Sequence, residues 1–373
     1  MWYAIHTLLR ETNRFGPAIV AVGACAMLLM VQISMFLSAL NYISKPVSAA
    51  QADLWIGHQD AVSFEEGRPI PQRWVTRLAA EPDVAETEYY LMGTSLLRKA
   101  NGGSELCTVI GVPLDEGSLG AGQMIPPSLR DRLRSPGAVA ANASEVERLG
   151  FRKRGYGGEV SGHSVYYVGY VHDFKRFTAP YLFCSIETAR QLLPAIKGGE
   201  TTYILVRCRT PEQAPDLAAR LRRNFPSMAV YTQQEFVAQT QVHWFTRTKS
   251  GLMLLFVTVI GCLVSLFVTS QTLYAATAAA RHEYAVLDAM GIPRRRIASA
   301  VLWQSLWVGL IAALLGIPAS YVVSTLLDIA GVPARFEPWL VAVGAALTIV
   351  TAPISGLISL RSLRLIEPAE LLH

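Results

Sequence analysis

Charged residues are scarce in this chain. Asp, Glu, Lys and Arg make up 16% of its 373 residues, against about 25% in a typical soluble domain. Hydrophobic residues make up 51%, and the mean hydropathy is +0.31. Soluble proteins seldom combine these values, so we expect a membrane protein. In such a protein the net charge of +5 indicates orientation and contact with the lipid bilayer, and no basic patch with interleaved aromatic residues indicates nucleic-acid binding.

The motifs of common catalytic sites are also absent. The sequence has no G-x-x-x-x-G-K-[ST] loop for a nucleotide phosphate, no H-E-x-x-H zinc motif and no G-x-S-x-G nucleophile elbow. His163, and His172 beside Asp173, have no marked nucleophile near them, so we interpret them as surface residues. We therefore expect no catalytic residue, cofactor or metal site on the chain. A membrane-anchored enzyme stays open as an alternative.

The five cysteines form no C-x-x-C pair, which argues against zinc and thioredoxin chemistry. Cys25 and Cys262 lie in apolar runs and are expected to be plain core residues. Cys107, Cys184 and Cys208 lie in the large middle region. A Cys184–Cys208 disulfide and three free thiols are both open from the sequence.

Four long apolar runs are predicted to cross a bilayer, at 15–41, 249–278, 297–327 and 338–360. Each contains a stretch of at least about 20 residues without charge, which is enough to span. The first is too long for the apolar core of a signal peptide, which covers about 7–15 residues, so we interpret it as an uncleaved anchor. Because the spans carry no carboxylate or lysine in their interior, a proton relay is not expected. Gln32 and Asn41 are interpreted as polar contacts between helices or at the interface.

The arginines near the spans predict the orientation. With four spans they all fall on one side, which places both termini in the cytoplasm. Residues 1–14 are then expected to form an amphipathic helix on the membrane, 328–337 a periplasmic loop, and 361–373 a cytoplasmic tail. These arginines are Arg10, Arg14, Arg281, Arg294, Arg295, Arg296, Arg361 and Arg364.

The middle region, 42–248, has the mixed texture of an exported α+β domain, and we expect two subdomains. Two hairpins are predicted, with turns at 101–103 and 160–163, because Gly and Asn stand between β-prone runs. Further strands are expected at 53–57, 138–141, 201–208 and 228–231, and helices at 71–80, 144–149 and 211–224.

A capping box starts the last helix of this region. Thr232 is the N-cap and Glu235 stands three residues on. No proline follows until Pro293, so we predict one nearly continuous stalk helix over 233–278, roughly 70 Å long, with Trp244 near the membrane interface. The alternative is two helices joined at 247–251.

The segment 279–296 stands out between the second and third spans. Tyr284, Leu287 and Met290 form an apolar stripe, and Gly291 stands where a helix end needs a left-handed residue. This stretch resembles the cytoplasmic coupling segment of MacB/FtsX-type (type VII) ABC transporter permeases, which reads roughly R-x-E-x-x-x-L-x-A-[LM]-G-[AI]-x-x-x-x-I. The matching residues are Arg281, Glu283, Leu287, Ala289, Met290, Gly291 and Ile297.

The resemblance implies a membrane α-helical protein with four transmembrane helices and a large α+β periplasmic domain between the first two. It implies that an ABC ATPase dimer on a separate chain holds the ATP and magnesium, and binds Arg281, Glu283, Tyr284, Leu287, Met290, Gly291, Arg294 and Arg295. A second permease copy, as a homodimer in the bacterial inner membrane, is implied as well.

The organisation of this chain, without a fused ATPase, resembles that of the DevC-like permeases, which act with a membrane fusion protein. The expected function is ATP-driven export of an amphipathic or lipid-like substrate. Two alternatives within the family stay open, a regulator that passes ATP-driven motion to a periplasmic hydrolase and a lipoprotein-releasing permease.

Overall fold

The computed structural model divides into two compact units. The helical unit comprises residues 1–38 and 253–373, and the sheet unit comprises 39–252. The structure describes residues 12–122, 124–151, 155, 157–172, 174, 179–279, 286, 290–329, 339, 341–346, 348–350 and 353–354.

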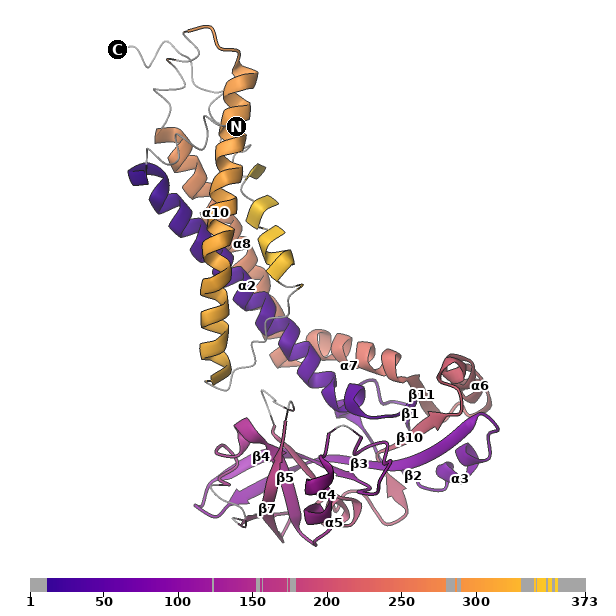
Figure 1. The fold of residues 1–373 in the computed structure, drawn as a ribbon. Helices are drawn as coiled ribbons and strands as arrows, with labels where there is room; N and C mark the ends of the chain where they lie inside the picture. The colour runs from indigo at the N-terminus through magenta and orange to yellow at the C-terminus, as the bar shows by residue number, and fades with distance from the viewer. Residues whose placement is uncertain are drawn as a thin grey trace. The chain divides into compact units, whose positions relative to one another are not determined.

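Among the described residues, three helices are long and apolar enough to cross a bilayer (Figure 1). They are α2 (Thr12–Ala49), α8 (Lys249–Ala279) and α10 (Arg294–Ile329). A shorter apolar helix covers Val341–Val350. About half of the fourth expected span, 338–360, lies outside the described residues, as do residues 1–11 of the expected amphipathic helix.

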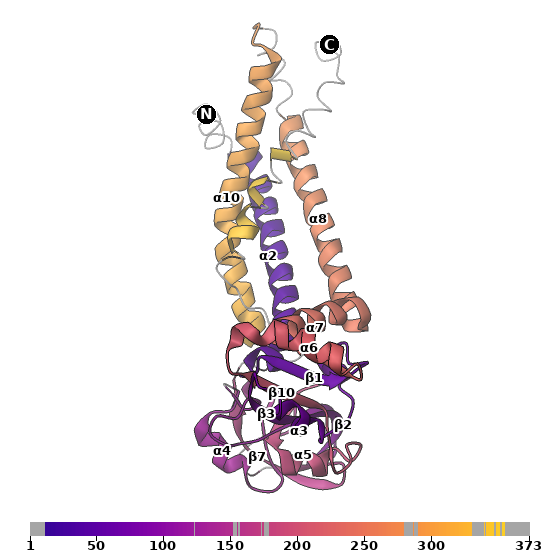
Figure 2. The ribbon, with the colours of Figure 1, turned by 90° about the vertical axis from the view of Figure 1, so that its right-hand side faces the viewer.

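Small residues and one amide bring the three helices of the helical unit together. Gly23 of α2 and Gly316 of α10 let the two backbones approach, because a Cβ at Gly316 would lie 3.0 Å from the carbonyl oxygen of Gly23. On α8, Gly261 makes room for the Gln32 side chain, which donates to the carbonyl oxygen of Val257 at 3.3 Å. Gln32 is thus a polar contact between helices, as expected. Figure 2 shows α2 beside α10.

The sheet unit is built on one nine-stranded sheet. Its strand order is β11-β1-β10-β3-β4-β8-β5-β7-β6. In chain order the strands are β1 (Leu54–His58), β3 (Val84–Lys99), β4 (Ser104–Val112), β5 (Ala138–Asn142), β6 (Gly157–Val160), β7 (His163–Val171), β8 (Tyr181–Ser185), β10 (Tyr203–Cys208) and β11 (Met228–Thr232). A separate pair joins β2 (Ile70–Pro71) and β9 (Glu200–Thr201).

The long strand β3 joins the two halves of this sheet. Along one edge it pairs first with β10, through Val84–Tyr90, and then with β6, through Leu97–Lys99. Along the other edge it pairs with β4. Since β6 continues through β7, β5 and β8 back to β4, six strands form a closed ring at this end. The sheet is therefore open at one end and closed at the other, with β3 common to both halves; the two expected subdomains stay a prediction.

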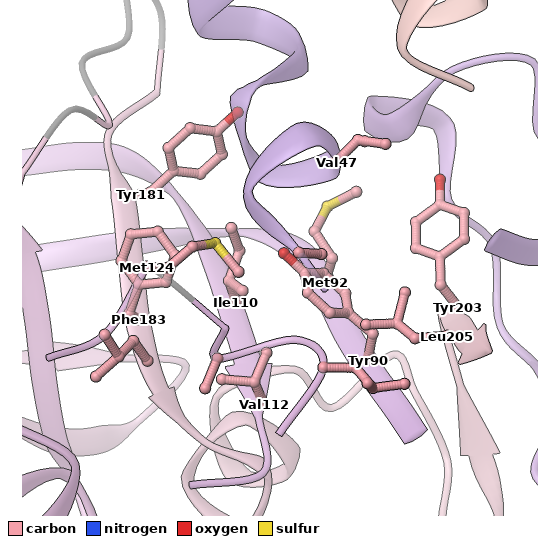
Figure 3. Packing of buried hydrophobic residues seen from close by; sticks show 14 of the residues in the cluster. Val47, Tyr90, Met92, Ile110, Val112, Met124, Tyr181, Phe183, Tyr203 and Leu205 are labelled. Carbon is pink, nitrogen blue, oxygen red and sulfur yellow. The ribbon is translucent and has the colours of Figure 1, made fainter. Parts of the chain in front are cut away.

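Three buried clusters fill the unit. The ring encloses one, to which all six of its strands contribute: Leu97, Val109, Leu182, Val139, Val165 and Val160 are examples. The open end packs against α3 (Trp74–Ala79) and α6 (Ala214–Asn224) through a second cluster. The largest lies over the other face and contains Val47, from the last turns of α2, with Met92 and Tyr203 (Figure 3). Both faces of β5 and β8 are buried, which explains their continuous apolar runs.

The remaining helices are short. They are α4 (Pro127–Leu133), α5 (Ile186–Leu192) and α7 (Gln233–Arg247), with 3-10 turns at Phe64–Glu66, Ala143–Glu145 and Pro211–Gln213. Both predicted hairpins are present, and their turns place Gly102 and Gly162 at φ 87° and 83°.

The helix expected at 144–149 is wrong. The chain makes only the 3-10 turn Ala143–Glu145 and then further turns to Gly150, whose φ is 78°. Tertiary packing overrides helix propensity here, because Leu149 and Phe151 belong to the cluster inside the ring. Arg148 also reaches Glu105 at the base of β4, with Nε 2.9 Å from the carboxylate.

All five cysteines are free thiols. Cys184 belongs to the cluster inside the ring and Cys208 to the cluster at the open end, so the Cys184–Cys208 bridge is not formed. Cys107 is free as well. Burial raises the pKa of Cys107 to about 12 and that of Cys208 to about 11, which makes these thiols inert at neutral pH.

One carboxylate is buried where the sheet unit meets the end of α2. Glu88 on β3 accepts from the Ser118 hydroxyl at 2.8 Å and from the backbone N–H groups of Leu119 and Gly120 at 2.6 and 2.8 Å. Leu119 in turn accepts from the backbone N–H of Gln51, two residues past α2. Burial raises the pKa of Glu88 above its ordinary value of 4.5, and outweighs the hydrogen bonds from Gly120, Ser118 and Leu119.

This raised pKa predicts a pH dependence of stability. The folded protein binds the Glu88 proton more tightly than the unfolded chain, so the stabilisation is fully present below 4.5 and is lost as the pH rises through the raised pKa. Glu88→Gln removes this titration. In thermal unfolding of the full chain, the free energy of unfolding of the wild type minus that of Glu88→Gln should therefore fall with rising pH across that window. A difference that rises with pH contradicts the assignment.

Candidate functional site

The site that the structure assembles lies around α7. The capping box at its start is present as predicted, with the backbone N–H of Glu235 donating to the Thr232 hydroxyl at 3.2 Å and the Glu235 carboxylate accepting from Thr232 N–H at 2.9 Å. Arg222 also contacts Glu235. Burial alone would raise the pKa of Glu235, but the hydrogen bonds from Thr232 and Arg222 hold it below its ordinary value. The start of α7 is thus fixed by local contacts.

The buried face of α7 fixes the helix on the sheet unit. Phe236 packs into an aromatic cluster with Trp55, Tyr203 and Tyr231, with ring centroids 5.3–5.6 Å apart. One turn on, the Thr240 hydroxyl accepts from the backbone N–H of Phe64 at 3.1 Å. Such contacts make α7 part of the rigid body of the sheet unit.

A second side of α7 holds the end of α2. The Gln233 side-chain amide lies 3.0, 3.4 and 2.8 Å from the carbonyl oxygens of Val47, Ser48 and Ala50. Two turns further along α7, the Gln241 amide donates to the Ser44 hydroxyl at 3.0 Å and to the carbonyl oxygen of Leu40 at 3.4 Å. We call these five contacts of Gln233 and Gln241 the glutamine clamp. Within it, Gln233 supplies donors to carbonyls at the end of α2, which a helix end leaves without partners.

The predicted continuous stalk is wrong. Helix α7 ends at Arg247, and α8 begins at Lys249, with Thr248 extended between them at φ −87° and ψ 142°. Thr248 ends one helix and starts the next, because its backbone N–H donates to the carbonyl of Trp244 at 3.2 Å and its hydroxyl accepts from the backbone N–H of Gly251 at 3.1 Å. We call residues 244–251 the corner.

Gly251 is required by this corner. A Cβ there would overlap the carbonyl group of Trp244, so the first turn of α8 lies directly against the last turn of α7. Trp244 itself is buried, and it serves as part of the corner. Its expected place at the membrane interface stays a prediction.

The structure describes the coupling segment in part. Gly291 has φ 83°, as the helix-end interpretation requires, and α10 begins three residues later at Arg294. Met290 is 65% exposed and Arg295 is exposed. Arg281, Glu283, Tyr284 and Leu287, for which the sequence predicts contacts with the ATPase, lie outside the described residues.

Sequence reasoning missed the clamp glutamines, and it gave the break near Thr248 only as the alternative, two helices joined at 247–251. Gln233 and Gln241 are eight residues apart and so share one face of a helix, a weak signal that any exposed face would also give. The sequence indicates the corner more strongly, because Thr248 is a typical N-cap residue and the small residue Gly251 follows three positions later. Among the described residues, no His, Cys, Asp and Glu side chains gather in a group that could hold a metal ion.

The comparison with protein families identifies the C-terminal part of the helical unit. Residues 255–368 match the model "FtsX-like permease C-terminal". The chain carries an FtsX-like permease domain. The matched region includes the coupling segment and α10, so the family expected from residues 281–297 is confirmed. No curated protein gives a significant match to the chain.

Three solved structures each align with about half of this chain. The periplasmic region of MacB from Actinobacillus actinomycetemcomitans is 11% identical, with a TM-score of 0.35, and covers 50% of this chain and 92% of its own. The extracellular domain of the noncanonic ABC-type transporter YknZ from Gram-positive bacteria is 11% identical, with a TM-score of 0.34, and covers 48% and 99%. A domain of a putative permease protein from Porphyromonas gingivalis is 14% identical, with a TM-score of 0.29, and covers 49% and 89%.

The corner gives a direct prediction about Gly251. Gly251→Ala places a methyl group against the carbonyl group of Trp244. We expect this overlap to lower the free energy of unfolding by about 1–3 kcal/mol and to open the corner. Trypsin can report the opening, because Arg247 and Lys249 flank Thr248 and are exposed. Cleavage at these two sites should therefore accelerate by roughly tenfold or more. Ser250→Ala, at the exposed neighbouring position, should leave the rate unchanged; equal rates in the two variants contradict the corner.

Proposed function

We propose that this chain is the permease subunit of an ABC transporter, coupling ATP hydrolysis by a separate ATPase to movement of the sheet unit. The observation that carries the proposal is the FtsX-like permease match over 255–368, which includes the predicted coupling segment. The sequence itself has no phosphate-binding loop of the G-x-x-x-x-G-K-[ST] type, so the nucleotide and its magnesium are assigned to a partner. A dimer of ATPases on a permease homodimer is the arrangement that the family resemblance favours.

The sheet unit is proposed to lie in the periplasm of a bacterial inner membrane. The arginines that flank the spans support this orientation, and a unit of about two hundred residues is long enough to be exported regardless of its own charge. The cargo class, an amphipathic or lipid-like molecule handled with a membrane fusion protein, rests on the resemblance to the permeases without a fused ATPase.

Topology can be tested with single cysteines in a background without the native ones. Ser104→Cys and Glu212→Cys lie at exposed positions of the sheet unit, and they should react with an impermeant thiol reagent added outside intact cells. Ser299→Cys and Glu370→Cys should react only after the membrane is opened. Labelling of residue 370 from outside contradicts the four-span arrangement.

The coupling role can be tested at Leu287. The family motif places this side chain in an apolar groove of the ATPase, so Leu287→Asp would bury an unpaired charge at a cost of several kcal/mol. We expect an inserted, folded permease that loses its ATPase in a mild-detergent pull-down. Val286→Asp places the same charge on the preceding residue, off the Tyr284–Leu287–Met290 stripe, and should retain the ATPase.

The same pull-down distinguishes the family's functions. A membrane fusion protein recovered with the wild-type chain supports export, and a periplasmic hydrolase recovered in its place points to the regulatory alternative. Normal ATPase recovery and normal activity in Leu287→Asp would refute the coupling assignment.

A further inference from the structure

Among the described residues, the nine-stranded sheet has one free edge. At its closed end β6 pairs with both β7 and β3, so the ring leaves no strand open. At the other end β11 pairs with β1 alone. An edge strand offers a row of backbone N–H and C=O groups to any further strand, and native proteins protect such edges.

The strand β11 carries none of the usual protection itself. Residues Met228–Thr232 read Met-Ala-Val-Tyr-Thr, with no charged residue, proline or glycine. The strand pairs with β1 in one register over all five residues, without a bulge. Valine, tyrosine and threonine favour strands, and short uncharged runs of such residues readily join strands of other chains. Protection of this edge must therefore come from neighbouring segments.

Three alternate residues of β11 turn their backbone groups away from β1. The N–H of Met228 donates at 3.0 Å to a carbonyl of the turn that precedes the strand, and the N–H of Thr232 donates at 2.9 Å to the Glu235 carboxylate. Between them, the carbonyl oxygen of Val230 accepts from Nε of Arg222 at 2.7 Å. This arginine belongs to the last turn of α6, which lies beside β11 in Figure 1.

A second bond holds Arg222 in place. Its Nη2 contacts the Glu235 carboxylate, so the guanidinium plane is fixed by a carbonyl and a carboxylate at once. Val230 is only 1% exposed although it lies on an edge strand. The Arg222 side chain is 40% exposed. A solvated charge therefore stands at the position where a further strand would have to pair.

We propose that Arg222, held by Glu235, guards the free edge of the sheet, occupying the pairing position at Val230 and so keeping β11 from joining the sheet of a second copy of this chain. A further strand could pair there only after the guanidinium had lost its bond to the carbonyl and part of its water, which is costly. We call this pair of residues the edge guard. Glu235 then has two roles, one in the capping box and one in the guard.

The strand that the guard excludes is β11 of the second copy. The described part of the nine-stranded sheet offers no other free edge, so two such sheets can join only through their β11 strands. Antiparallel pairing centred on Val230 would place the uncharged residues of the two strands opposite one another, without like charges in register.

The test uses the full chain in nanodiscs and a fluorescent peptide with the sequence of residues 225–233, which stands for β11 of the second copy. Two guard variants, Arg222→Ala and Arg222→Met, remove the charge, and the second keeps most of the length of the side chain. The matched control is Arg223→Ala, at the next exposed position of α6, which makes no hydrogen bond to β11 in the part of the chain that the structure describes.

The peptide should bind both guard variants at least tenfold more tightly than it binds the wild type or the control. On its addition, hydrogen exchange of residues 228–232 should slow at least fivefold in the guard variants and stay unchanged in the control. Arg222→Lys keeps a charge at the edge and should exclude the peptide as the wild type does.

A second peptide with Val230→Pro separates strand pairing from loss of folding. It cannot donate the N–H that a ladder needs, so it should bind none of the chains. The proposal is overturned if the first peptide binds the guard variants no better than the control. It is also overturned if both peptides bind the guard variants equally, because a loosened chain then binds any apolar segment.

Discussion

The carbonyl groups at the end of α2 are the constraint on which the arrangement of this protein depends. A helix that leaves a membrane ends with carbonyls that have no partner within the helix, and a buried end needs donors from elsewhere. Here Gln233 reaches the carbonyls of Val47, Ser48 and Ala50. Because Gln233 is also the first residue of α7, one side chain ties the end of α2 to the helix that leads to the next membrane segment.

The surrounding sheet unit reinforces this connection. Trp55, Tyr203 and Tyr231 hold Phe236, so α7 cannot move without the strands that carry them. Glu88 orders the loop at Leu119, which binds the backbone of Gln51 just past α2. The closed ring of six strands lies at the far end of β3 from β10 and has its own buried cluster. The contacts that receive α2 therefore come from the open end of the sheet and from the loop that Glu88 holds.

Local chemistry decided which parts of the structure the sequence could predict. The capping box at Thr232, the hairpin turns at Gly102 and Gly162 and the left-handed Gly291 each depend on a few neighbouring residues, and they are present. The turns at 143–150 and the clamp depend on partners far along the chain; Gln233 and Val47 are 186 residues apart. Helix α2 continues past the predicted span 15–41, through Lys45 and Pro46, to Ala49. The break at Thr248 was not the favoured prediction, because the apolar pattern on either side of it is typical of one continuous helix.

The central claim is that α2 is one unbroken helix from the helical unit into the sheet unit, and a distance along it tests this most directly. Val20 and Asn41 are exposed positions of α2 on opposite sides of the crossing. Nitroxide labels at Val20→Cys and Asn41→Cys, in chains diluted with unlabelled protein and without the native cysteines, should lie about 32 Å apart if the helix is unbroken. Pulsed electron paramagnetic resonance should give one narrow distribution near that distance, both with and without ATP. A broad or two-peaked distribution, or a mean that moves with ATP, would contradict the account.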